Sequence, residues 1–191
     1  FYRYLLRARP PLDAEFEPFA WLDAGRQGDV LHAVFERVGR EVIAGTLDLR
    51  DGDVATARAL ALLDARLAEV ALELPPPSDW IRDAEREALA ETLRRWVAVE
   101  GEALADGARW LEVEADLAGT VVRLGDFDVE VAGRIDRVDR LADGTLRVVD
   151  YKTTRRGAPK YFGKGGRHLR GGRLVQPLLY ALALATARGT A

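Results

Sequence analysis

The amino-acid sequence predicts a mixed α/β fold in which helices come first and a small sheet follows. Two long stretches rich in Ala and Leu lie on either side of Pro75-Pro76-Pro77, which is typical of two helices with a sharp break between them. From Trp110 onward, apolar and polar residues alternate with a period of two, which is typical of strands. The 191 residues suffice for one well-buried domain. We therefore expect a single domain over 1–191, with a helical part over 28–107 and a core over 110–191.

The composition is that of an ordinary globular protein, with 48% hydrophobic and 31% charged residues. The absence of cysteine excludes disulfides, a thiolate nucleophile and a cysteine-ligated metal or iron-sulfur site within these residues. The only two histidines, His32 and His168, are too few and too separated for a histidine-only metal site. The chain starts at Phe1 and has no methionine, so we expect it to be a piece of a longer reading frame.

No apolar run approaches the roughly 18 residues of a membrane span. No signal peptide precedes the first motif. We therefore expect no membrane association and a cytoplasmic location.

The first part of the chain is predicted to be a loop followed by a helix. Residues 1–7 are expected to end a helix, and the Pro-rich residues 10–24 to form a loop. The next helix is predicted to begin near Gly28 or Asp29. Its apolar residues recur at helical spacing; they are Leu31, Val34, Phe35, Val38 and Val42. His32 lies beside this apolar stripe.

Two more helices are predicted before the strands begin. One covers residues 53–72, and the other runs from a cap at Ser78 or Asp79 to about Ala105. The sequence assigns no chemistry to either of them. Strands then follow, with turns near Gly119 and Gly125 that predict an antiparallel meander.

Residues 129–153 are predicted to form a hairpin whose turn decides the positions of its charged residues. If residues 142–144 form a three-residue loop with Gly144 in the left-handed conformation, Leu141 pairs with Thr145. The ladder then sets Asp136 opposite Asp150, with Lys152 on their face. A two-residue turn would shift the register by one and send Asp136 to the other face.

In the favoured register, the two carboxylates repel each other across adjacent strands. A positive group is expected between them, either Lys152 or a divalent cation. Two hard carboxylates suit Mg²⁺ or Mn²⁺, which can activate a water for phosphodiester hydrolysis. The alternative is that these are exposed strand residues, because a D-x-K tripeptide is common by chance.

The hairpin is followed by a basic segment and a last helix. Residues 152–173 contain eight Lys or Arg residues and no acidic residue, and 155–173 hold six glycines. This segment, beginning with Arg155 and Arg156, is either a mobile or ligand-ordered loop for a polyanion or a solvated basic loop. A helix is predicted over 175–188, with Pro177 in its first turn. No P-loop motif is present.

Four motifs, in order over about 150 residues, resemble the PD-(D/E)XK nuclease superfamily and specifically its RecB-like branch. They are G-x-x-x-H at Gly28 to His32, G-x-I-D-R-V-D at Gly133 to Asp139, V-D-Y-K-T at Val149 to Thr153, and Q-x-x-x-Y at Gln176 to Tyr180. The resemblance implies a restriction-endonuclease-like core. In such a core, helices flank a central mixed sheet that begins with an antiparallel meander, here with an N-terminal helical annex.

The resemblance also implies a role for each matching residue. His32, Asp136 and Asp150 would be metal ligands together with the backbone carbonyl of Tyr151. Asp136, Asp150 and Lys152 would be the catalytic residues. For His32 the alternative is a packed core residue, which is the usual state of a histidine beside an apolar stripe.

Other residues match or flank the family's DNA-contacting positions. Gln176 and Tyr180 match the motif that contacts the DNA strand and supports the site, although a polar residue and a tyrosine on a helix are otherwise ordinary packing. Three more candidates lie on the strands: Arg134 and Arg137, for phosphate contacts or surface ion pairs, and Glu114, for support of the site.

The resemblance implies a Mg²⁺- or Mn²⁺-dependent deoxyribonuclease for DNA end processing and recombinational repair. Its substrate would be single-stranded or end-derived DNA, fed by a helicase module in the same or a partner chain. One alternative is an inactive nuclease-fold module that binds DNA or acts as a scaffold, and another is a restriction-type or mobile-element endonuclease. Some members of the branch carry an iron-sulfur cluster, which this chain cannot hold without cysteine and which stays unknown for the parent protein.

Overall fold

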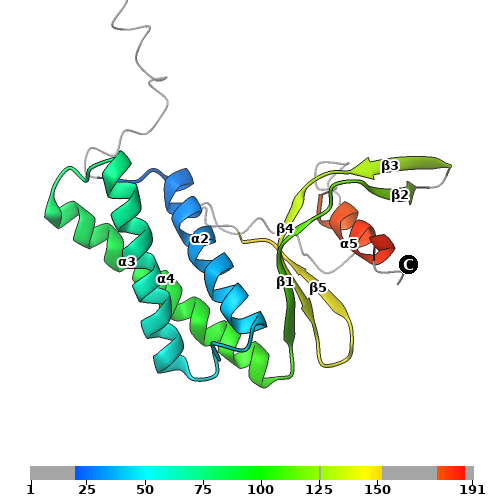
Figure 1. The fold of residues 1–191 in the computed structure, drawn as a ribbon, viewed down its shortest axis with the longest axis horizontal. Helices are drawn as coiled ribbons and strands as arrows, with labels where there is room; N and C mark the ends of the chain where they lie inside the picture. The colour runs from blue at the N-terminus through cyan, green and yellow to red at the C-terminus, as the bar shows by residue number, and fades with distance from the viewer. Residues whose placement is uncertain (1–19, 125, 152–175, 188–191) are drawn as a thin grey trace, which may run out of the picture.

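The computed structural model describes residues 20–124, 126–151 and 176–187, and places three helices at one end of the molecule and the strands at the other (Figure 1). The mixed α/β class is confirmed. Several predictions lie outside the described residues: the helix end at 1–7, the loop at 10–19, the turn at Gly125, the position of Lys152, and the conformation of the basic segment with Arg155 and Arg156.

The helical part consists of α2 (Ala24–Ile43), α3 (Gly52–Glu73) and α4 (Asp79–Ala105). Each begins at a side-chain cap that accepts a hydrogen bond from a first-turn N–H: Asp23 from Arg26, Asp51 from Val54, and Ser78 from Ile81. Of the two residues predicted to cap the third helix, Ser78 and Asp79, Ser78 is the cap. The predicted start of the first helix near Gly28 is wrong, because Asp23 caps it inside the segment that its prolines had marked as a loop.

One hydrophobic core holds the three helices together. It contains Leu31, Val34, Phe35 and Val38 of α2, four of the five residues of the predicted stripe, and it reaches Trp110 at the start of the strands. The chain that enters α2 is fixed to this core, because the indole of Trp21 donates to the Leu74 carbonyl at 2.8 Å. The helical part therefore has its own buried interior, and α2 is firmly seated in it.

Five strands follow: β1 (Arg109–Asp116), β2 (Thr120–Leu124), β3 (Phe127–Val131), β4 (Arg134–Arg140) and β5 (Leu146–Val149). All pairs that the described residues form are antiparallel, but β1 pairs with β4 and not with β2, so the predicted turn near Gly119 does not join two paired strands. The order is β1-β4-β5 in a three-stranded sheet, while β2 and β3 form a separate hairpin. Figure 1 shows this hairpin extending away from the helices, beside the last helix.

The last helix, α5 (Gln176–Ala187), covers the β2–β3 hairpin and forms a second core with the strands. Ile135 and Val138 of β4 pack there with Ala183 and Leu184 of α5. The predicted helix over 175–188 is thus confirmed within the residues described. The three-stranded sheet stands between two separate cores, one helical and one shared with α5.

Candidate metal centre

Asp136 lies on the middle strand of the sheet, between β1, which carries Glu114, and β5, which Asp150 follows directly. On one side, β5 pairs with β4 through Arg137–Val149 and Val138–Val148. Leu141 donates to Thr145 across the turn at 2.8 Å, and Gly144 has a φ of 86°. The predicted three-residue turn is confirmed, and its register continues toward Asp136 and Asp150 just beyond the end of the ladder.

On the other side, a β-bulge in β1 brings Glu114 opposite Asp136. Trp110 pairs with Asp139 before the bulge and Glu112 with Val138 after it, so one extra residue of β1 is inserted. Without the bulge, Glu114 would oppose Ile135 and point to the other face. Glu114 has a φ of 53°, the one non-glycine residue with positive φ among those described.

His32 reaches this row of carboxylates from α2. Its Nε2 lies 3.0 Å from the carbonyl oxygen of Tyr151. A carbonyl can only accept a hydrogen bond, so Nε2 is the donor in this contact and Nδ1 is the ring nitrogen that remains for a metal ion. Nδ1 lies 3.8 Å from Oδ2 of Asp136. A backbone carbonyl that accepts from the second ring nitrogen is the usual support of a metal-binding histidine.

Close packing of α2 on β1 makes this reach possible. An ideal Cβ built on Gly39 would lie 2.5 Å from Cγ1 of Val113, closer than real Cβ atoms approach a neighbour. Gly39 lies two turns after His32 on the same side of the helix. The absence of a side chain at Gly39 therefore sets how near His32 comes to the sheet.

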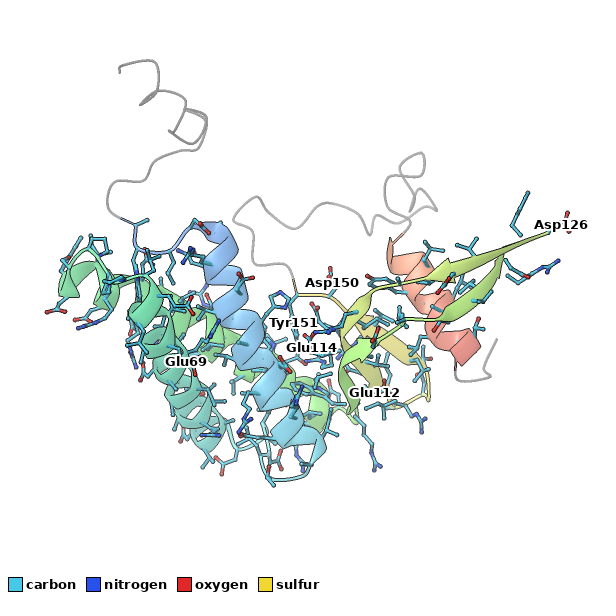
Figure 2. All side chains as sticks on the ribbon, turned by 45° about the horizontal axis from the view of Figure 1, so that its top comes forward. Glu69, Glu112, Glu114, Asp126, Asp150 and Tyr151 are labelled. Atoms are coloured by element: carbon cyan, nitrogen blue, oxygen red, sulfur yellow. The ribbon has the colours of Figure 1, made fainter. Side chains whose placement is uncertain are left out.

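One ligand atom from each of His32, Glu114 and Asp136 lies within 4.8 Å of the others, and all three residues are half-buried. Figure 2 places Glu114, Asp150 and Tyr151 in the region between α2 and the sheet. An imidazole nitrogen with two carboxylates fits Mn²⁺, and the carboxylates also suit Mg²⁺. The donor set thus fits a divalent cation.

Asp150 and the Tyr151 carbonyl, the other predicted ligands, are placed differently. Asp150 is exposed at the end of β5 and is not a member of the group of three. The Tyr151 carbonyl faces His32, and the Tyr151 N–H donates to Oδ2 of Asp136 at 2.6 Å. The carbonyl has a second lone pair, so its role as a metal ligand stays a prediction, as does that of Asp150.

Two cationic side chains flank Asp136 in the sequence but have different surroundings. Arg134 is exposed, and its guanidinium lies 3.3 Å from Oε2 of Glu114. Arg137 is 1% exposed, because strand alternation points it to the other face. The expectation of a phosphate contact or a surface ion pair is therefore wrong for Arg137.

Arg137 belongs to a buried charge cluster. Its Nη2 donates to Glu100 of α4 at 2.8 Å, and its Nε lies 2.8 Å from Asp139 Oδ1 without the direction of a hydrogen bond. Asp139 also accepts from Arg147 at 2.6 Å. The burial of Arg137 disfavours its charge, but Tyr151, Glu100 and Asp139 outweigh this effect and raise its pKa above the ordinary value.

Tyr180 of α5 lies over Gly133, at the start of β4. A Cβ on Gly133 would collide with the Tyr180 hydroxyl oxygen. Two motifs recognised separately in the sequence thus meet in space, a few residues from Asp136. Gln176 lies in the first turn of α5, and its side chain is outside the described part of the structure.

The sequence indicates too small a role for Glu114 and none for Glu100. Glu114 was expected only to support the site, because strand alternation gives no sign of a bulge. Glu100 follows Leu93 and Val97 at helical spacing, so it falls on a buried stripe. A carboxylate on a buried stripe needs a partner. This was the signal in the sequence that α4 contributes a charged contact as well as apolar packing.

The comparisons with known proteins give one match. Neither the curated proteins nor the solved structures include a match to this chain. Among the helices that the structure describes, none has the length and apolar character needed to cross a membrane. The model of the PD-(D/E)XK nuclease superfamily matches residues 1–191.

Proposed function

Because the chain belongs to the PD-(D/E)XK nuclease superfamily, we propose that it is a divalent-metal-dependent deoxyribonuclease of the RecB-like branch. The observation that carries this proposal is the convergence of His32, Glu114 and Asp136 from three different elements. Like-charged carboxylates side by side are unfavourable without a cation. The ordered motifs Gly28 to His32 and Gly133 to Asp139 support the choice of branch.

A bound Mg²⁺ or Mn²⁺ would supply an activated water and charge neutralisation at the scissile phosphate. In this chain, Nδ1 of His32 and the carboxylates of Glu114 and Asp136 would hold the ion. The Tyr151 amide fixes the rotamer of Asp136. We further propose that Asp150 and the Tyr151 carbonyl complete the ligand set.

Lys152 is the proposed catalytic lysine, because it follows Asp150 by two residues as the superfamily's motif requires. An ammonium beside the reacting phosphate would orient the attacking water or neutralise developing charge. Asp136 and Asp150 would be its catalytic partners.

The DNA would lie along the side of the site that faces α5. Tyr180 and Gln176 are the proposed strand contacts, with Arg134, Arg155 and Arg156 binding phosphates. The contact of Tyr180 with Gly133 supports this placement, since it ties the helix to the strand that carries Asp136. A single strand or an end presented by a helicase, in DNA repair and recombination in the cytoplasm, is the proposed context.

The test is cleavage of a fluorescent single-stranded oligonucleotide by the purified chain with Mg²⁺, Mn²⁺ or EDTA. Asp136→Ala and His32→Ala should lose cleavage by at least 100-fold, while Asp128→Ala, an exposed acid on β3, should not. Cleavage that persists in EDTA or in Asp136→Ala would overturn the proposal. A wild-type chain that neither cleaves the oligonucleotide nor binds Mg²⁺ or Mn²⁺ in calorimetry would favour the inactive DNA-binding or scaffolding module.

A further inference from the structure

Tyr151 connects the candidate metal centre to the helical core. Its backbone N–H donates to Asp136, and its carbonyl faces Nε2 of His32. Its ring packs against Phe35 of α2, with ring centroids 4.4 Å apart, and against Trp96 of α4 at 6.2 Å. The position of two proposed ligands therefore depends on a residue whose side chain is anchored elsewhere.

The Tyr151 hydroxyl is held by Arg137. Nη1 of Arg137 donates to it, and the guanidinium stacks 4.0 Å from the centroid of the Trp110 ring. Burial raises the pKa of the Tyr151 phenol well above its ordinary value, although the positive charge of Arg137 opposes this shift. The hydroxyl thus stays neutral and keeps accepting from Arg137.

Arg137 is in turn fixed by carboxylates from two elements. Glu100 of α4 is 8% exposed and Asp139 of β4 is fully buried. Arg147 of β5 contacts Asp139 as well, so two cations face two anions in the cluster. Removing one member of such a buried set leaves a charge without compensation, and the remaining side chains must move.

We propose that Glu100 and Arg137 are positioning residues, which hold Tyr151 by its hydroxyl and thereby set the geometry of Asp136 and His32. A continuous path of contacts leads from Glu100 through Arg137 and the Tyr151 ring to the Tyr151 backbone. Outer residues that orient metal ligands typically change metal affinity by 10- to 100-fold when they are replaced. For its effect on a cation, this inference rests on the proposed function.

The experiment uses Tyr151→Phe, which deletes the hydroxyl but keeps the ring among Phe35 and Trp96. In the metal-free protein, we expect the Tyr151 amide to exchange at least 10-fold faster by NMR, while the amides of β4 such as Val138 keep their protection. Mn²⁺ binding, measured by calorimetry and by the EPR line shape, should weaken about 10-fold. Glu100→Gln should change both readouts in the same direction.

Arg58→Gln is the matched control. Arg58 pairs with Glu41 at 2.6 Å and links α3 to α2 outside the path. Because Arg58 has a purely structural role, Arg58→Gln should lower the free energy of unfolding. It should change neither the exchange rate of the Tyr151 amide nor the Mn²⁺ affinity.

Amide exchange and Mn²⁺ binding test the two proposals separately: the first tests the positioning role, and the second tests the metal-dependent function. An unchanged Tyr151 amide in both Tyr151→Phe and Glu100→Gln would overturn the positioning role. A uniform loss of protection across β4 would also overturn it, because the cluster would then be structural only. A wild-type chain that binds no Mn²⁺, with a faster Tyr151 amide in the variants, would overturn the metal-dependent function and leave the positioning role standing.

Discussion

Gly39 of α2 and Val113 of β1 lie so close together that no side chain fits between them, since a Cβ on Gly39 would come 2.5 Å from Cγ1 of Val113. This contact fixes the distance between the helix that carries His32 and the strand that carries Glu114. Two donors of the candidate metal centre are thus placed by one glycine.

Gly39→Ala should therefore weaken cation binding without touching a donor. The added methyl group must push α2 from the sheet or turn Val113 aside, and such overpacking costs about 1–3 kcal/mol. We expect a lower free energy of unfolding and a several-fold weaker Mn²⁺ affinity by calorimetry. Gly39→Ala with Val113→Ala should recover most of the affinity, and a double variant as weak as the single one would contradict this explanation.

Glu114 has a positive φ, which is sterically unfavourable for a residue with a Cβ. The cost of this conformation in folding free energy can be measured. Glu114→Ala and Glu114→Gly both remove the carboxylate, so both should lose Mn²⁺ affinity by at least 10-fold. Only glycine relieves the backbone, because it adopts positive φ without a steric penalty. We expect Glu114→Gly to be more stable than Glu114→Ala by about 1 kcal/mol in urea unfolding. Equal stabilities would show that the backbone is relaxed there.

Arg134 competes with a cation for Glu114. Its guanidinium lies 3.3 Å from Oε2 of Glu114 and is largely exposed. Arg134→Gln should therefore strengthen Mn²⁺ binding in the absence of DNA by roughly 2- to 5-fold, the scale of a surface ion pair. The same variant should bind single-stranded DNA more weakly, with a shallower salt dependence. Arg123→Gln, on the far hairpin, is the control, and weaker Mn²⁺ binding in Arg134→Gln would contradict the competition.

The contact between Gly133 and Tyr180 should appear as a coupling in a double-mutant cycle. Gly133→Ala drives a methyl group into the Tyr180 ring and should destabilise the protein by about 1–3 kcal/mol. Tyr180→Ala makes room, so Gly133→Ala should cost less in that background, and the cost that remains comes from the φ of 156° at Gly133, which disfavours any side chain. The measurement is urea unfolding of the four proteins. Additive losses would mean that the two residues do not contact each other in solution.

Local sequence signals were enough to predict most helices and strands. They were also enough to predict the position of Asp136 in the site. Ser78 capped its helix where predicted, because its hydroxyl satisfies a free N–H regardless of tertiary context. Gly144 likewise fixed the turn of the β4–β5 hairpin, because glycine tolerates its positive φ. The register of Asp136 followed from that turn alone.

The other half of the site depended on tertiary contacts that leave no periodic signal. The bulge in β1 inserts one residue without a glycine or proline to mark it, so the face of Glu114 could not be deduced. Arg137 looked like a surface cation because its partner Glu100 is 37 residues away. The predicted start of α2 is too late for a local reason. The nearby prolines indicate a loop over the segment that contains Asp23, the cap of the helix.

The three metal donors are divided between the two hydrophobic cores. The candidate metal centre is therefore intact only while both cores are folded. His32 is carried by a helix of the first core, whereas Asp136 lies on a strand whose neighbours Ile135 and Val138 belong to the second. Any fluctuation that lets one core open while the other stays folded takes a donor away. A metal ion held by all three donors would oppose every such partial opening. Metal binding would therefore make the two cores unfold as a single unit.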